Sequence, residues 1–200
     1  MRKQPTQERA HRTIGLIFEA TAQIVDKEGA EALSTNKIAR LAGVSIGTLY
    51  QYFPTKEAII VAMVSQEQQR VMTEMHAMLS QVLKGAWEPE AFIQARVRVL
   101  VRSFGAGTQL NRAMVRLAWH MDHHEQVAQS QREAAEHLGI ALARINHPEL
   151  RAPSPVMLFV ATRAVIGVIR SASLEKSPLL DSAELEDELA RMVWALFRAG

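Results

Sequence analysis

Polar side chains with hydrogen-bonding groups crowd the segment from residue 45 to residue 52. They are Ser45, Thr48, Tyr50, Gln51 and Tyr52. On an exposed helix, such groups can bond to base edges in the major groove of DNA, where each base pair presents its own pattern of donors and acceptors. Gly47 lets a partner approach the backbone closely, and Ile46 suits an apolar contact with a thymine methyl group. The segment is therefore a candidate for reading a DNA sequence.

The excess of positive charge lies at the N-terminal end of the chain. Residues 1–60 carry eight Lys and Arg against six Asp and Glu, whereas residues 61–200 carry fifteen of each. Four of the eight cations lie within the first twelve residues, which suits a basic arm that meets the DNA backbone. An ordinary solvated surface would show a similar balance.

A cluster of histidines further along the chain is a candidate metal site. It consists of His120, His123 and His124, at helical spacing, with their neighbours Asp122 and Glu125. Such a set can hold a divalent metal, but polar residues clustered on a helix are more commonly just solvated. We therefore expect neither a bound metal nor a cofactor.

Apolar spacing predicts one helix that ends near Gly29, followed by a short second helix. The first helix buries one face, which contains Ile14, Ile17, Phe18, Thr21, Ala22 and Val25. Ser34 can cap a second helix over Thr35–Ala42, in which Ile38 and Leu41 point inward together.

A tight turn at Gly43 connects this second helix to a third, which is predicted over Ile46–Phe53 and capped by Ser45. Pro54 cannot continue the third helix, and a long fourth helix is predicted from about Thr55 to Leu83. Two short helices joined by a glycine-containing turn form a helix-turn-helix, whose second helix lies in the major groove. The expected core positions are Ile38, Ala39, Leu41, Val44, Leu49 and Phe53.

Helical periodicity continues to the C-terminus, and no segment shows convincing strand alternation. It runs through residues 92–104, 114–121 and 127–145, and two apolar stripes follow. One stripe contains Met157, Ala161, Ala164, Val165, Val168 and Ala172, and the other contains Leu185, Leu189, Met192, Val193, Leu196 and Phe197. The predicted fold class is all-α.

The run from Ser34 to Glu57, with the pattern AGVS-x-GTLY-x-YF-x-x-KE at residues 42–57, resembles the TetR family of one-component regulators. The match extends from about Arg12 to Ala62, roughly a quarter of the chain, and its pattern is highly specific. The resemblance implies DNA contacts at Thr35, Asn36, Lys37, Ser45, Ile46, Gly47, Thr48, Tyr50, Gln51, Tyr52 and Lys56. Among these, Thr35 and Lys56 would bind phosphates, and Gln51 is the candidate for reading an adenine.

The resemblance also implies a division into two domains. Residues 1–55 would form a three-helix helix-turn-helix domain that binds DNA, and residues 56–200 a helical domain for effector binding and dimerisation. The fourth helix would link them. The two C-terminal apolar stripes would pack against their symmetry mates as a four-helix bundle. Packing of both stripes within one chain is the alternative.

An effector pocket is expected between the middle helices, because pockets in helical bundles are mostly apolar with a few polar groups. Its candidate lining residues are Phe92, Phe104, Met114, Trp119 and Met121, and plain core packing is the alternative for each. Candidates for binding an anionic ligand are Arg98, Arg102 and Arg116, for which surface charge is the alternative.

Several classes of protein are disfavoured by what the sequence lacks. There is no cysteine, so thiol nucleophiles and Cys-based zinc sites are excluded. The motifs GxxxxGK[ST], GxGxxG and HExxH do not occur, and we expect no enzyme. No secretory signal is visible, and the apolar stretch Pro155–Ile169 is short for a bilayer span and is interrupted by Arg163. We therefore expect a cytoplasmic protein.

Together these features predict a dimeric repressor that binds a palindromic operator and is released from it by a small-molecule effector. Binding of the effector would shift the fourth helix and move the two recognition helices apart, as a shift between two populated packings. A constitutive architectural DNA-binding protein, or an activator without an inducer, is the alternative. The sequence assigns neither the effector nor the operator nor the regulated genes.

Overall fold

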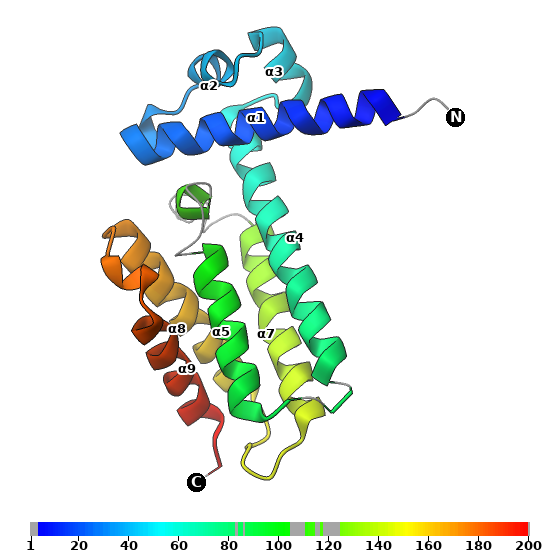
Figure 1. Ribbon diagram of the computed structural model, residues 1–200, viewed down its shortest axis with the longest axis vertical. Coiled ribbons are helices and arrows are strands. Elements are labelled where there is room, and N and C mark those ends of the chain that lie inside the picture. The colour runs from blue at the N-terminus through cyan, green and yellow to red at the C-terminus, as the bar shows by residue number, and fades with distance from the viewer. Residues whose placement is uncertain are drawn as a thin grey trace.

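The computed structural model consists of helices in an upper and a lower group, which one long helix connects (Figure 1). It describes residues 4–82, 84–85, 87–104, 111–114, 117 and 125–199. Within these ranges no β-strand occurs, and the prediction of an all-α fold is confirmed.

The upper group contains three helices and the start of a fourth. They are α1 (Gln4–Glu28), α2 (Thr35–Ala42), α3 (Ile46–Tyr52) and α4 (Lys56–Val82), with a 3₁₀ turn, η1 (Ala30–Ala32), after α1. The second helix has the predicted bounds, and the third ends one residue earlier than predicted. Residues from Gln4 onward belong to α1, so the segment that was expected to form a basic arm is helical from that point.

Side-chain caps and one glycine set the geometry of α2 and α3. The Ser34 hydroxyl accepts the backbone N–H of Lys37 at 3.3 Å, and the Ser45 hydroxyl accepts that of Thr48 at 3.0 Å. Gly43 adopts a left-handed conformation with φ of 67°, which costs a residue without Cβ little. The predicted caps and the predicted turn are confirmed.

The upper hydrophobic core lies between α1, α2, α3 and the first turns of α4. Its fully buried side chains include Ile17, Ile38, Leu49, Ile59 and Met63. Ala113, Met114 and Leu117 pack into the same core, although they come from much later in the chain. The upper core is therefore completed by residues from the middle of the chain.

Leu41 does not belong to this core, contrary to the sequence prediction, because its side chain is 49% exposed. The buried residues of α2 are Ile38, Ala39 and Ala42. At about 100° per residue, the arc that contains these three positions excludes Leu41, which lies to one side of it. Regular apolar spacing alone did not reveal how narrow the buried face of so short a helix is.

The lower group surrounds the remainder of α4. It contains α5 (Pro89–Phe104), α7 (Glu125–Ile145), α8 (Pro155–Leu174), a 3₁₀ turn η2 (Pro178–Asp181) and α9 (Ala183–Phe197), and residues 111–114 are also helical. In Figure 1, α4, α5 and α7 run side by side, and α8 and α9 cover one side of them.

Half of the residues of the two predicted C-terminal stripes are buried within this chain. Ala161, Val165 and Ala172 of α8 pack in the lower core with Leu189, Val193 and Phe197 of α9. The sequence analysis assigned these stripes to contacts with a second copy, and for these six residues that assignment is wrong. Packing against α5 and α7, and of α8 against α9, covers them instead. The stripe members Val168 and Met192 remain exposed.

Helix α8 is longer than the apolar stretch recognised in the sequence. Its twenty residues are long and apolar enough to cross a membrane by length and composition. Such a test is also passed by core helices of globular proteins. One face of α8 packs on α5, α7 and α9, so the helix is part of the lower group. The helix also contains two arginines, Arg163 and Arg170.

Candidate nucleic-acid interface and internal cavity

Helix α3 turns a polar face outward and an apolar face inward. Ser45, which caps it, and its residues Ile46, Gly47, Tyr50 and Gln51 are exposed. Leu49, on the opposite side, has no exposed surface and anchors the helix to the upper core. The predicted base-reading residues are thus accessible on a helix that is held rigidly from behind.

Three side chains from different elements gather at the start of α2. The Thr35 hydroxyl lies 3.2 Å from the Tyr50 hydroxyl, although fifteen positions separate the two residues. The Lys56 ammonium donates a hydrogen bond to the carbonyl oxygen of Leu33 at 3.4 Å, two residues before Thr35. Two hydroxyls therefore meet at the positive end of the α2 dipole, and an ammonium is bonded to the chain two residues before it, an arrangement that suits a phosphate group.

The other predicted contact residues have mixed surroundings. Asn36 is exposed, whereas the ammonium of Lys37 forms an ion pair with the carboxylate of Glu28 on α1. The Thr48 hydroxyl lies 2.8 Å from that of Ser45, and Tyr52 is partly buried against the upper core. Lys37 is therefore turned towards α1 in this conformation. Arg9 and Arg12, from the predicted basic arm, are exposed on α1, and residues 1–3 lie outside the described part of the chain.

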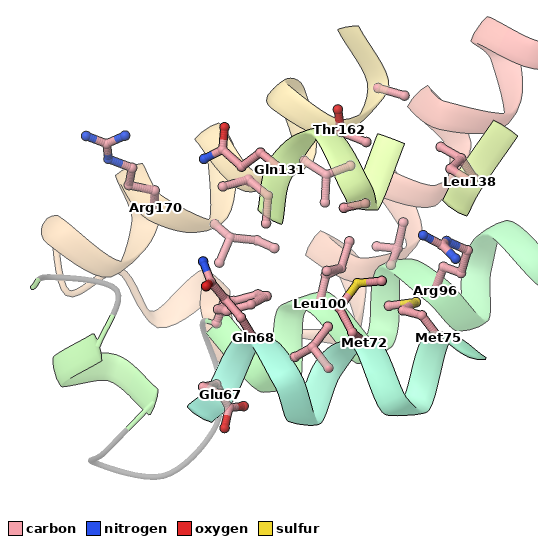
Figure 2. A pocket seen from close by; sticks show the side chains of 18 of the residues that line it. Glu67, Gln68, Met72, Met75, Arg96, Leu100, Gln131, Leu138, Thr162 and Arg170 are labelled. Atoms are coloured by element: carbon pink, nitrogen blue, oxygen red, sulfur yellow. The ribbon is translucent and has the colours of Figure 1, made fainter. Parts of the chain in front are cut away.

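A cavity of about 160 Å³ opens inside the lower group (Figure 2). Side chains from α4, α5, α7 and α8 form most of its wall, and nearly all of that wall is apolar. The polar residues on it are Glu67, Gln68, Arg96, Gln131, Thr162 and Arg170. An apolar cavity with a few polar groups is typical of a small-molecule site.

The predicted pocket residues are distributed unevenly around this cavity. Phe104 and Met114 line it, whereas Phe92 is fully buried in the lower core and is not part of the wall. Trp119 and Met121 lie outside the described residues, as do Arg116 and the histidines at 120, 123 and 124. Arg98 and Arg102 are exposed on α5, away from the cavity wall, and Arg98 pairs with Glu186.

Arg96 is a charged cavity residue that the sequence analysis missed. It occupies the buried side of α5, in line with Phe92 and Ile93, and only 6% of it is exposed. The signal was present in the sequence, because a cation stands four residues after Phe92, on a helical face that is otherwise apolar. The sequence analysis instead named Arg98, Arg102 and Arg116 as candidates for binding an anionic ligand.

Hydrogen bonds around Glu67 join α4 to the end of α5 and to residue 111. The buried Glu67 carboxylate accepts hydrogen bonds from Arg70 on the same helix and from the Asn111 amide, the latter at 3.0 Å. Asn111 also donates to the carbonyl oxygen of Ser103 at 2.6 Å. The hydrogen bond to Glu67 is the main cause that raises the pKa of Arg70 above its ordinary value. Glu67 also lines the cavity, so the network lies between the cavity and the residues that complete the upper core.

Replacing Glu67 by glutamine is expected to lower the free energy of unfolding by about 2 kcal/mol, because a buried acceptor is exchanged for a group that carries its own N–H donors. Equilibrium unfolding in urea measures the change. Glu74→Gln is the matched control, because Glu74 also pairs with Arg70 but is largely exposed, and its loss should cost less than about 1 kcal/mol. Equal effects of the two substitutions would show that the burial of Glu67 adds nothing to the free energy of unfolding.

Comparison with known proteins relates the N-terminal part of this chain to one family. Residues 17–63 match the family model described as bacterial regulatory proteins, tetR family. The HTH-type transcriptional repressor KstR of Rhodococcus jostii is 28% identical over 97 residues, which cover 42% of this chain and 46% of KstR. The chain thus spans less than half the length of this curated relative.

Solved structures share the fold over nearly the whole chain. A TetR family transcription regulator from Marinobacter aquaeolei VT8 superposes with a TM-score of 0.66 at 23% identity, covering 97% of this chain and all of that one. AibR, solved in complex with isovaleryl coenzyme A and operator DNA, superposes with a TM-score of 0.63 at 16% identity, covering 92% of this chain and 97% of AibR. At these identities the likeness shows the fold.

Proposed function

We propose that this chain, whose residues 17–63 match the model of the tetR family of bacterial regulatory proteins, is a homodimeric transcriptional repressor of that family, released from a palindromic operator by a small-molecule effector. Regulators of this family are not enzymes. A repressor of chromosomal genes works in the cytoplasm, which is the proposed location.

The arrangement of Thr35, Tyr50 and Lys56 is the observation that best supports DNA binding. These residues would hold one phosphate at the start of α2, and that contact would set the position of α3 in the major groove. Ser45, Ile46, Gly47, Thr48 and Gln51 would then face base edges. Asn36, Lys37 and Tyr52 are proposed as further backbone contacts, and Lys37 must first exchange its ion pair with Glu28 for a phosphate.

The proposed domain boundary lies between residues 55 and 56. Residues 1–55 would bind DNA, and residues 56–200 would bind the effector and form the dimer. Helix α4 belongs to the second domain but packs into the upper core through Ile59 and Met63, which makes it suited to carry a movement between the two.

Two connections support control of DNA binding from the cavity. Helix α4 supplies Val71 and Met75 to the cavity wall and Ile59 and Met63 to the upper core. Met114 lines the cavity and packs in the upper core at the same time. An effector that moves either element would tilt the upper group, and a ligand that favours the tilted packing would lower operator affinity.

A dimer is supported by the outward face of α8. Val156, Phe159 and Val160 are exposed there, on the side opposite to the buried Ala161 and Val165. A helix that is apolar on both faces normally has a partner on each. Two copies joined along α8 and α9 would hold their α3 helices about one turn of DNA apart on a palindromic site.

Binding of the full-length protein to DNA from its own upstream region, at fixed salt, tests the proposed DNA contacts. The double variant Tyr50→Phe, Lys56→Ala is expected to bind at least about tenfold more weakly, with the slope of affinity against salt reduced by about two for the dimer. Gln51→Ala should instead relax base preference at one position in each half-site. Fluorescence anisotropy over a series of salt concentrations measures both effects.

Lys84→Ala, an exposed lysine beyond the far end of α4, is the control and should bind as the wild type does. Salt-dependent binding of the wild type without base preference would favour the constitutive architectural protein and contradict the repressor. Specific binding that raises transcription would favour an activator, because the same DNA contacts serve both roles.

A further inference from the structure

Arg96 is a buried cation on the wall of the cavity. Its side chain is only 6% exposed, and the carbon of its guanidinium lies 5.6 Å from the centroid of the Phe92 ring. Its Nη1 atom is buried and has no hydrogen-bond partner in the described part of the chain. Buried donors are nearly always bonded in native proteins, so an unbonded guanidinium nitrogen beside a cavity points to a missing partner.

The described residues supply no negative charge to Arg96. Burial lowers the pKa of Arg96 to about 10, which still leaves the side chain protonated at neutral pH. His137 on α7 is also buried, and its pKa is lowered by burial and then by His76 and Arg96, so it stays neutral. Its ring packs edge-on against that of His76, with centroids 4.2 Å apart.

Among the described residues, the one carboxylate on the cavity wall already has other partners. Glu67 bonds to Arg70 and Asn111, and Figure 2 shows it at the opposite end of the cavity from Arg96. Met75 and Leu138 are labelled near Arg96 in the same view, and Gln68 and Gln131 lie towards the other end. An uncompensated charge in such apolar surroundings is unfavourable, and a bound anion would remove that penalty.

We infer that the effector is a small carboxylate, with an apolar body that fills the cavity and an anionic head that pairs with the Arg96 guanidinium. The inference rests on the proposed role of the cavity as the effector site. A guanidinium matches the planar fork of a carboxylate and can bind it through two parallel hydrogen bonds. A dry apolar cavity of about 150 Å³ accommodates a benzene ring, so the body is an aryl group or a short alkyl chain.

The direct test is calorimetric titration of the full-length protein with matched acids and neutral compounds. The pairs are phenylacetate with phenylacetamide and hexanoate with hexan-1-ol, which separate aryl from alkyl bodies. Wild-type protein is expected to bind at least one acid about tenfold or more tightly than its neutral partner, as a charge-assisted pair requires.

Three variants identify the group responsible. Arg96→Met keeps the volume of the side chain and should remove the preference for the acid while leaving affinity for the neutral compound within about twofold. Arg96→Lys retains the charge and should keep part of the preference. Arg102→Met, on the exposed side of α5, is the control and should bind as the wild type does. Thermal unfolding verifies the fold, and Arg96→Met should be at least as stable as the wild type, because an unpaired buried charge is removed.

The inference is overturned if acids and neutral compounds bind equally, if Arg96→Met retains the preference, or if none of the four compounds binds. Operator release, measured separately, distinguishes this inference from the proposed function. An acid that binds through Arg96 without weakening operator binding contradicts the effector role and leaves the pairing intact. Release by neutral compounds alone contradicts the pairing and leaves the effector role intact.

Discussion

Replacement of Phe159 and Val160 by aspartate is expected to dissociate the protein into monomers and to weaken operator binding by about a thousandfold or more. Phe159 is 58% exposed and Val160 is 46% exposed on the outward face of α8. Two carboxylates per copy in the proposed interface would be buried opposite like charges from the partner, which is strongly unfavourable. A monomer keeps only half of the base and phosphate contacts, so its affinity approaches that of non-specific binding.

Sedimentation equilibrium measures the oligomeric state, and anisotropy with labelled operator measures affinity in the same buffer. Ile140→Asp is the control, because Ile140 is also an exposed apolar residue of the lower group but belongs to α7. The control should remain dimeric and bind normally. A dimeric double variant with unchanged affinity would show that α8 does not form the interface.

Replacement of Leu49 by alanine is expected to lower the free energy of unfolding by about 3 kcal/mol or more. Leu49 has no exposed surface and is the one fully buried side chain of α3. Shortening it leaves a cavity beneath the helix, which the surrounding α-helices can fill only in part. Because α3 carries the proposed base contacts, operator affinity should fall together with stability.

Leu41→Ala is the matched control for this prediction, since it changes the same side chain on the adjacent helix. Leu41 is half exposed, and its loss should change the unfolding free energy by less than about 0.5 kcal/mol. Urea unfolding followed by circular dichroism measures both variants. A cost for Leu41→Ala as large as that for Leu49→Ala would contradict the arrangement of the upper core described above.

Local signals were sufficient to predict the helix-turn-helix. Ser34 and Ser45 provide acceptors for free N–H groups at the two helix starts, Gly43 takes the left-handed conformation of the turn, and Pro54 ends the third helix. All of these effects act between residues a few positions apart. They fix the bounds of α2 and α3 within one residue.

The candidate DNA contacts were identified largely by their resemblance to a family pattern. Sequence order could not place Thr35 beside Tyr50, because their contact depends on the angle at which α2 meets α3. It also gave no indication that Lys37 would pair with Glu28, which belongs to another helix. These pairings depend on distances across the fold and not along the chain.

By itself, the amino-acid sequence determined the all-α class, the helix-turn-helix and the polar outer face of α3, because periodicity, capping and turn formation are local. The tertiary structure alone decided which apolar and charged residues are buried. Leu41 lies outside the core, half of the residues in the two C-terminal stripes are covered by other helices of the same chain, and Arg96 lies at a cavity with no partner for its Nη1 atom among the described residues. The physical reason is that a helix with apolar residues on several faces can bury any of them, and only packing against other helices selects which face becomes core and which becomes surface.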